Sequence, residues 1–574
     1  MKPVQIRRRP PASQGQWPES LPPLLQRIYA ARGALDLEQA RPPLARLLPP
    51  DALSGLRTAV RLLSEAIDAD RRIVVVGDFD CDGATACAVG VRGLRMLGAG
   101  HVAYAVPNRM VHGYGLSPAL VAELAAMRPD ILVTVDQGVA CHAGVAAARD
   151  RGWQVVVTDH HLPGESLPAA DAIVDPNLDA DGFASKALAG VGVIFYVLLA
   201  LRRYRRELGL LRAGEPDLGV LLDLVAVGTV ADLVPLDANN RALVGAGLRR
   251  LRAGHGCAGL RALIEVSQRQ PARLTATDIG FALGPRLNAA GRLEDMALGI
   301  ECLLCDDPAR ARELAESLNA INSERRQVQQ RMTSDAEAAL ARVELSGTAA
   351  PATAVCLFDA QWHQGVVGLV ASRMKERLYR PVIAFAPTEP GAGMLRGSGR
   401  SIPGFHLRDA LVAVDAMHPG LIERFGGHAM AAGLSLDLRH LPAFQQALED
   451  YASRTLDEAL LQSVLWSDGE LLPGEFDRFH AEALRDGGPW GQGFSEPLFD
   501  GVFELIDWRV LRDAHLKLTL AHPSGGKPLS AIHFNGWHGQ PPGMRLHLAY
   551  RLMPDDYRGG DAVQLVVEHH LAVA

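Results

Sequence analysis

Three short apolar segments in the first third of the chain each end in residues of the kinds that bind metal ions. The segment 71–77 is followed by Asp78, Asp80 and Asp82, the segment 131–135 by Asp136, and the segment 153–158 by Asp159, His160 and His161. Apolar runs of this length, separated by helical patterns, are typical of strands buried on both faces. The sequence therefore predicts an α/β fold with a doubly wound parallel sheet, and the acidic residues meet at its carboxyl edge, where such sheets place their sites.

The first acidic group, Asp78-Phe79-Asp80-Cys81-Asp82-Gly83, carries three carboxylates two residues apart. In an extended segment they would project from one side, and carboxylates so close repel one another unless cations lie between them. With Asp136 and an imidazole, the set suits two divalent ions, and its oxygen ligands favour Mn²⁺ or Mg²⁺. Alone, this motif could be a calcium-binding turn or a solvated loop; the ending of three apolar strands in residues that bind metals favours a metal site.

Asp232 is a further candidate ligand, because it follows the apolar helical segment 221–230. An acidic residue on such a turn can reach back to a metal ion, and it can equally be a loop residue without a role. Both interpretations remain open at this point.

Charge and cysteine content restrict the class of protein. The net charge is −7, whereas a protein that simply coats nucleic acid is usually basic; a nucleic acid partner would therefore need a local basic surface or bound metal ions. The seven cysteines are odd in number and irregularly spaced, which favours a reducing cytoplasm. The apolar stretch 187–201 is shorter than the roughly 20 residues of a membrane span, so we expect a buried helix and no membrane association.

The pattern divides the chain into five segments. Residues 1–50 are a Pro- and Arg-rich lead-in, and 346–457 form a second, smaller α/β domain. Residues 458–574 show period-2 runs that suggest an antiparallel barrel. The remaining two segments are the first α/β domain, 51–305, and a connecting helix, 306–345, with no Pro or Gly between 309 and 345.

Four motifs now identify a resemblance. GDFDCDG (77–83), VTVDQG (133–138), VVVTDHH (155–161) and VADLVPL (230–236) resemble, in this order, the metal-binding motifs of the DHH phosphoesterase superfamily. GPRLNAAGRL (284–293), WHQGVVGLVASRM (362–374), GSGRS (397–401) and GGHAMAAG (426–433) resemble further motifs of its RecJ branch, which comprises bacterial exonucleases specific for single-stranded DNA. The resemblance covers nearly the whole chain. It implies a DHH domain (51–305), a DHH-associated domain that clamps the substrate (346–457) and an oligonucleotide-binding (OB-like) barrel (458–574).

The resemblance also implies roles for individual residues. Two metal ions would be held by Asp78, Asp80, Asp82, Asp136, His160 and Asp232, with Asp136 as the bridge. The catalytic pair would be His161, facing the scissile phosphate or the water, and Asp159, orienting the histidines. Gln137 departs from the family, in which an Asn is commoner at this position.

Substrate contacts are expected from a further set of residues near glycines and arginines. For each arginine the alternative is a surface salt bridge, and for Arg109 the two interpretations are equally open. We favour function for Arg400 and His428, because glycines flank both. The set is Arg109, Arg286, Asn288, Arg292, Ser398, Arg400, Ser401, Gly427 and His428.

The implied function is a two-metal-dependent 5′-to-3′ exonuclease that hydrolyses single-stranded DNA to mononucleotides in DNA repair and recombination. Polarity and processivity come from the resemblance alone, as do the expected partners, a single-strand-binding protein and a RecQ-type helicase; we expect a monomer. One alternative is a DHH phosphodiesterase of short oligonucleotides or cyclic dinucleotides, although such proteins tend to lack the β domain. Another is a non-catalytic scaffold that binds nucleic acid on a DHH fold, although all expected ligands are present here.

Overall fold

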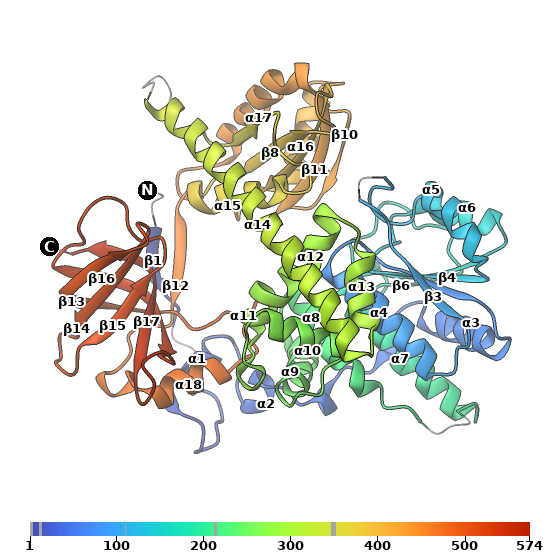
Figure 1. Ribbon diagram of the computed structural model, residues 1–574, viewed down its shortest axis with the longest axis horizontal. Coiled ribbons are helices and arrows are strands. Elements are labelled where there is room, and N and C mark those ends of the chain that lie inside the picture. The colour runs from blue at the N-terminus through green and yellow to red at the C-terminus, as the bar shows by residue number, and fades with distance from the viewer. Residues whose placement is uncertain (1–3, 11–13, 110, 212–214, 346–351, 574) are drawn as a thin grey trace. The chain divides into compact units, whose positions relative to one another are not determined.

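A computed structural model describes residues 4–10, 14–109, 111–211, 215–345 and 352–573. The chain folds into two compact units (Figure 1). The larger unit comprises Arg8–Asn322 and Ser467–Ala574, and the smaller unit comprises Met1–Arg7 and Ser323–Trp466. The predicted start of the second domain at residue 346 lies outside the described residues, and the other predicted domain limits stay predictions.

The larger unit is built on a five-stranded sheet in the order β3-β2-β4-β5-β6, with every neighbouring pair parallel. Its strands are β2 (Ile73–Val76), β3 (Val102–Ala105), β4 (Ile131–Val135), β5 (Gln154–Thr158) and β6 (Ala172–Val174). The helices that alternate with them are α3 (Leu56–Asp68), α4 (Cys81–Met96), α5 (Pro118–Leu124), α6 (His142–Asp150) and α7 (Gly190–Glu207).

Both faces of this sheet are buried, because side chains alternate along a strand. In β2, Val74 and Val76 belong to the apolar cluster that includes α5 and α6, whereas Ile73 and Val75 belong to the cluster that includes α4 and α7. Each fully buried side chain of this size contributes roughly 1.5–3 kcal/mol. Cover on both faces explains the uninterrupted apolar runs and confirms the predicted parallel, doubly wound sheet.

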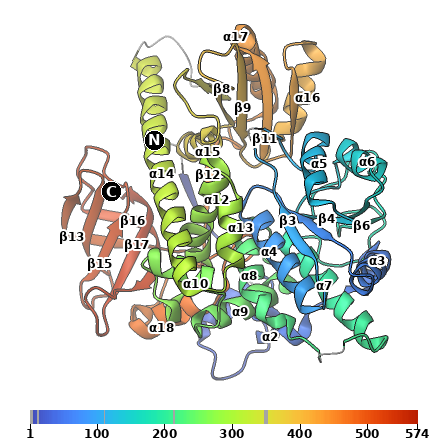
Figure 2. The same cartoon turned by 45° about the vertical axis from the view of Figure 1, so that its right-hand side comes forward.

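A helical layer follows the sheet in sequence. It comprises α8 (Leu222–Ala231), α9 (Ala238–Arg252), α10 (Ala258–Val266), α11 (Ala276–Asp278), the π-helix η6 (Ile279–Leu283), α12 (Gly284–Leu293) and α13 (Ala297–Leu304). The predicted connecting helix is α14 (Pro308–Leu345), a single long helix in both views (Figure 2). Among the described helices, none has both the length and the apolar content needed to cross a membrane.

The C-terminal part of the larger unit is a closed barrel in the order β13-β14-β15-β17-β16, which confirms the predicted barrel. It is not antiparallel throughout, because β15 and β17 pair in parallel. Its strands are β13 (Phe499–Leu511), β14 (His515–Ala521), β15 (Leu529–His533), β16 (Arg545–Pro554) and β17 (Val563–Ala572), and α18 (Arg478–Asp486) precedes them. The lead-in carries β1 (Val4–Arg8), α1 (Pro23–Ala30) and α2 (Leu37–Ala40). It joins this part through buried Tyr29, whose hydroxyl donates to the carbonyl oxygen of Gly487 at 2.7 Å.

The smaller unit contains a mixed sheet in the order β10-β11-β9-β8-β7, in which only β7 and β8 are parallel. Its strands are β7 (Val355–Phe358), β8 (Val382–Pro387), β9 (Met394–Arg400), β10 (Arg424–Gly427) and β11 (Ala431–Asp437). Its helices include α15 (Val367–Leu378), α16 (Leu407–Met417) and α17 (Leu441–Thr455), and β12 (Ser463–Ser467) pairs with β1.

The crossing of α8 and α9 gives a test of the packing. A Cβ atom on Gly247 would lie 2.1 Å from the carbonyl oxygen of Leu222 and 2.4 Å from Cβ of Ala226. We expect Gly247→Ala to lower the free energy of unfolding by about 1–3 kcal/mol, because the helices must move apart. Gly245→Ala is the control on the same helix: the nearest atom is the end of Arg249 at 3.5 Å, and alanine favours the helix by up to about 1 kcal/mol. Equal melting temperatures for the two variants would contradict this packing.

Candidate metal centre

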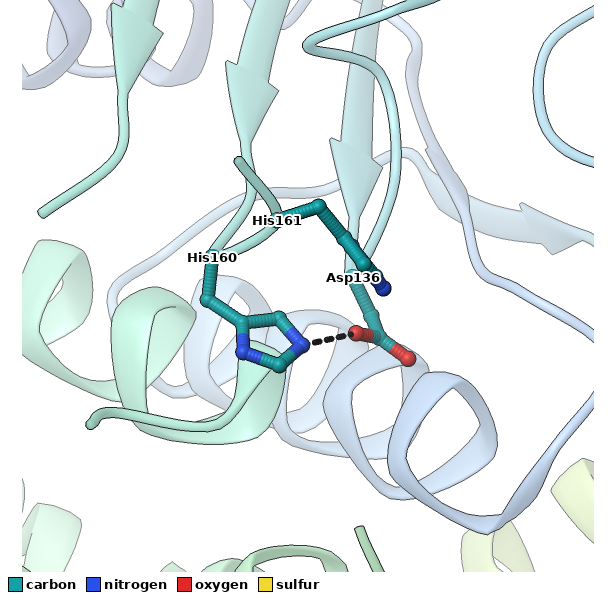
Figure 3. A group of neighbouring side chains, drawn as sticks. All are labelled: Asp136, His160 and His161. Atoms are coloured by element: carbon teal, nitrogen blue, oxygen red, sulfur yellow. Dashed lines mark ion pairs between the residues drawn. The ribbon is translucent and has the colours of Figure 1, made fainter. Parts of the chain in front are cut away.

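The acidic strand ends meet at the carboxyl edge of the sheet. Asp78 follows β2, Asp136 follows β4 and His160 follows β5, and these three strands are neighbours. Strand order reverses between β2 and β4, since β3 lies on one side of β2 and the later strands on the other. Figure 3 shows Asp136 and His160 turned toward each other, with Oδ1 of Asp136 3.1 Å from Nε2 of His160.

The local conformation of the first acidic motif differs from the predicted extended segment. Asp80 is the N-cap of α4, and its Oδ1 accepts a hydrogen bond from the backbone N–H of Gly83 at 3.0 Å. Asp82 therefore lies in the first turn of α4 rather than on a strand. The prediction that the three carboxylates share one side of an extended chain is wrong, because the capping interaction starts the helix at Cys81.

The N-terminus of α7 contacts the cluster at Asp82. The backbone N–H groups of Gly190 and Val191 donate to the two carboxylate oxygens of Asp82, at 2.6 and 3.0 Å, and the helix dipole favours this negative charge. A Cβ atom on Gly190 would lie 2.4 Å from Cβ of Asp136, so glycine is required at this position. Asp136 itself has a φ of 60°, in the left-handed region that non-glycine residues adopt uncommonly.

The side chains form three overlapping groups of potential metal ligands, each with its ligand atoms within 4.8 Å of one another. Oδ2 of Asp232, at the C-cap of α8, lies 3.6 Å from Nε2 of His160, so this residue does reach back to the cluster. The groups are Asp78, Asp80 and Asp136; Asp82, His160 and Asp232; and Asp136, His160 and His161. All six predicted metal ligands are thus brought together.

The electrostatics of the cluster favour bound cations. Burial, together with the charges of neighbouring carboxylates, raises the pKa of Asp78, Asp136 and Asp232 well above the ordinary value. Burial and the charge of Asp80 raise the pKa of Asp82 to about 7. Oδ1 of Asp78 is buried and accepts no hydrogen bond from the described residues. A buried group of carboxylates with oxygen available for coordination fits one or two divalent ions.

Asp159 organises the histidines rather than joining the ligand groups. Its Oδ1 accepts from the backbone N–H of His160 at 2.8 Å and from Nδ1 of His161 at 2.7 Å, and its Oδ2 accepts from the N–H of Val139 at 2.9 Å. Burial disfavours the charge on both partners of the pair. The hydrogen bond and the opposite charges outweigh it, lowering the pKa of Asp159 and raising the pKa of His161 to about 9.

Two residues that position the site were not identified from the sequence in this role. Asn177 donates from its amide to the carbonyl oxygen of His160. Gln137, noted only as a departure from the family, is buried; its Oε1 accepts from the N–H of Leu116 at 2.9 Å and its Nε2 donates to the oxygen of Val76 at 3.2 Å. The amide thus joins the end of β2 to the loop before α5. Neither residue has a charge or a spacing that could have indicated the role.

Of the predicted substrate residues in the larger unit, Arg109 and Asn288 contact the acidic motif 78–83. The guanidinium of Arg109 lies 4.0 Å from the ring centroid of Phe79, and its charge lowers the pKa of Asp78, although burial outweighs that effect. Oδ1 of Asn288, on α12, accepts from the backbone N–H of Cys81 at 2.8 Å and so holds the start of α4.

The two α12 arginines differ in exposure. Arg286 is buried and donates to Asn319 on α14 at 3.0 Å and to the carbonyl oxygen of Ala282 at 2.7 Å. Arg292 is partly exposed in the last turn of the same helix.

The other predicted substrate residues gather within the smaller unit. The pairing of β9 with β11 places Arg400 opposite Ala431 and Ser398 opposite Gly433. His428 donates its backbone N–H to the oxygen of Ala431, closing the turn that follows β10. Arg400 donates to Oγ of Ser398 at 3.1 Å.

Two further members of the set have structural contacts in this turn region. The hydroxyl of Ser401 is buried and donates to the oxygen of Phe405 at 2.6 Å. A Cβ atom on Gly427 would lie 2.5 Å from the oxygen of Ala431. A substrate contact for any of these residues stays a prediction.

Three family profiles match successive parts of the chain. They are the DHH family, N-terminal domain, over residues 72–229, the DHHA1 domain over residues 351–454, and the RecJ OB domain over residues 467–569. The chain is 51% identical to the single-stranded-DNA-specific exonuclease RecJ of Dickeya dadantii over 99% of both chains.

The structure is also similar to two crystal structures of RecJ from Thermus thermophilus, one in complex with Mn²⁺ and one with Mg²⁺. The TM-scores are 0.79 and 0.75 at 31% and 30% identity, and the matches cover 100% of this chain and 80% and 79% of those chains.

The crowded carboxylates predict opposite effects of one substitution with and without metal. A raised folded-state pKa means that the ionised form of Asp136 destabilises the folded protein above the unfolded pKa, a cost that disappears as the pH falls. In EDTA at neutral pH we therefore expect Asp136→Asn to raise the melting temperature. Saturating Mn²⁺ stabilises the wild type by about 2.7 kcal/mol at 100 times its Kd, and the variant should lose most of this gain. A melting temperature that falls in EDTA, or an undiminished response to Mn²⁺, would contradict the assignment.

Proposed function

This chain belongs to the RecJ family of single-stranded-DNA-specific exonucleases, and from this membership we propose that it hydrolyses single-stranded DNA with two bound divalent metal ions, Mn²⁺ or Mg²⁺. The observation that carries the proposal is the convergence of Asp78, Asp136, His160 and the other potential ligands on one edge of the sheet. A non-catalytic scaffold would not need this complete set. The closed C-terminal barrel supports a long strand as substrate rather than a dinucleotide.

Different residues of the chain have different roles in phosphodiester hydrolysis. When bound, the two ions supply positive charge at the phosphate and a more acidic water. Asp136 lies in both the group with Asp78 and the group with His160, and this shared position suits it to bridge two ions. Asp159 holds a proton at Nδ1 of His161 and thereby fixes the ring in one orientation toward the phosphate or the attacking water. Arg109 adds positive charge near Asp78.

The finer points of the function also belong to the proposal. Attack from the 5′ end, release of mononucleotides and a role in DNA repair and recombination rest on the resemblance of the motifs, as do association with a single-strand-binding protein and a RecQ-type helicase and a monomeric state. We place the protein in the cytoplasm, because its seven cysteines are free thiols.

The activity is tested with an oligonucleotide labelled at its 3′ end. With Mn²⁺ we expect progressively shorter labelled products from the single strand and no digestion of a blunt duplex. Asp136→Ala should lower the rate by more than about 100-fold. Mutating a residue that only supports a metal ligand already costs roughly 10–100-fold in metal affinity or activity, and this substitution removes a predicted ligand itself. Immediate release of the labelled nucleotide would instead indicate attack from the 3′ end. An intact strand under conditions in which Mn²⁺ raises the melting temperature would refute the exonuclease and direct attention to dinucleotide substrates.

The role of Asp159 is tested by Asp159→Asn, which keeps the shape but loses the charge that holds His161. We expect kcat to fall about 10–100-fold with little change in KM. The matched control is Asp171→Asn at the other end of β5, where the carboxylate accepts from the N–H of Val155 at 2.8 Å. This control should keep nearly the wild-type rate. Equal losses in both variants would show that Asp159 only supports the strand.

A further inference from the structure

A second charged site lies within the larger unit, away from the acidic cluster. A cavity of about 570 Å³ opens between the last turns of α9, the segment 268–278 and the residues that follow α18. None of the residues predicted to bind metal or substrate lines it. Its lining includes seven arginines and four carboxylates, a formal excess of three positive charges. Its volume lies within the range of small-molecule sites, roughly 300–1,000 Å³.

Several of these arginines have evident structural partners. Arg241 donates to three backbone carbonyl oxygens, those of Gln39, Ala40 and Leu236. The others pair with lining carboxylates: Arg269 with Asp278 at 3.2 Å, Arg273 with Asp556 at 2.7 Å, and Arg485 with Asp486 at 2.8 Å.

The lining carboxylates are therefore already engaged. Asp556 is also shared with Arg478, and Glu496 pairs with Arg551; neither of these two arginines lines the cavity.

Four lining arginines have no carboxylate within ion-pair distance among the described residues: Arg41, Arg241, Arg249 and Arg252. Arg241 is held by the three carbonyl oxygens, which leaves Arg41, Arg249 and Arg252 as the remaining charges. Arg41 donates Nε to the hydroxyl of Tyr29 and Arg252 donates Nε to the carbonyl oxygen of Leu274, each at 2.7 Å. Arg249 is exposed and lines the cavity. Neutral oxygens satisfy hydrogen bonds but do not offset the charges.

These charges repel one another across the cavity. Burial lowers the pKa of Arg252, and the positive charges of Arg485 and Arg41 lower it further, against the opposing charges of Asp486 and Asp278. The dipole of α9 explains positive charge at its last turn. It does not explain why Arg41 and Arg485, from other elements, converge on the same space. A bound anion would relieve this repulsion.

Trp490 lines the cavity, and its surroundings indicate which part of a nucleotide the cavity can recognise. Trp490 is 7% exposed, its ring is stacked on Phe494 with centroids 5.3 Å apart, and its indole N–H donates to the oxygen of Leu484. A nucleobase therefore has no aromatic face to stack on here. Recognition rests on the charge of the arginines, which suits phosphate oxygens.

We propose that this cavity is a phosphate-binding site, occupied either by a free nucleoside phosphate or by the backbone phosphates of a nucleic acid strand, with no selection among bases. The site does not depend on the nuclease activity, because no residue of the acidic cluster contributes to it. Guanidinium groups from the end of α2, α9 and α18 form its charged wall.

The test measures binding to the full-length protein in EDTA at low ionic strength, where the metal-free acidic cluster repels anions. The probes are thymidine 5′-monophosphate by calorimetry, thymidine as the ligand without phosphate, and a fluorescent oligothymidylate by anisotropy. Arg249→Gln removes one exposed charge, Arg249→Lys keeps it, and Arg252→Gln is a second variant inside the cavity. Arg261→Gln, an exposed arginine on α10 outside the lining, is the control for net charge.

We expect Arg249→Gln and Arg252→Gln to weaken binding about tenfold, Arg249→Lys to weaken it less and Arg261→Gln to leave it nearly unchanged. If the cavity variants bind the monophosphate more weakly than the wild type does, a free nucleotide is the ligand. If the monophosphate does not bind and the strand alone loses affinity in the cavity variants, the ligand is the backbone phosphate. The proposal is overturned if both cavity variants keep wild-type affinity for both probes, if Arg261→Gln shows the same loss, or if thymidine binds measurably and as tightly as its monophosphate. Melting temperatures show that each variant is folded.

Discussion

Mutual repulsion among buried carboxylates is the constraint on which the metal centre depends. Asp78, Asp136 and Asp232 hold pKa values well above normal because burial and neighbouring charges both disfavour their ionised forms. The backbone N–H groups at the start of α7 offset part of this cost for Asp82. The loops that carry Asp78 and Asp136 start from strands whose apolar side chains are buried on both faces of the sheet. The crowded carboxylates lower the stability of the metal-free folded protein, and bound cations would offset this cost.

The architecture was predictable because it follows from periodicity and position. Uninterrupted apolar runs require a sheet covered on both faces, and a parallel sheet brings the ends of β2, β4 and β5 to one edge. Asp78, Asp136 and His160 could therefore be placed together without coordinates. The four superfamily motifs made the set specific, and the period-2 runs near the C-terminus sufficed for the barrel.

Most of the interactions that fix the site were not predictable, because they join residues far apart in sequence. The exception is local: the spacing of Asp80 and Asp82 suggests an extended segment, whereas the side chain of Asp80 caps a helix that begins at Cys81. The partner of Asp82 is a backbone amide at Gly190, which no side-chain pattern reveals. The sequence predicts a substrate contact for Asn288, whereas in the structure its side-chain Oδ1 accepts a hydrogen bond from the backbone N–H of Cys81.

The net charge of −7 illustrates the same limit, since a sum over the chain contains no information on where charges lie. Five of the acidic residues lie in the cluster at one edge of the sheet, whereas Arg41, Arg252 and Arg485 come from three separate elements to one cavity. Coulomb energy depends on local separation and burial rather than on the total. An acidic protein can therefore act on a polyanion, because cations neutralise the acidic edge while clustered arginines provide positive potential elsewhere in the same unit.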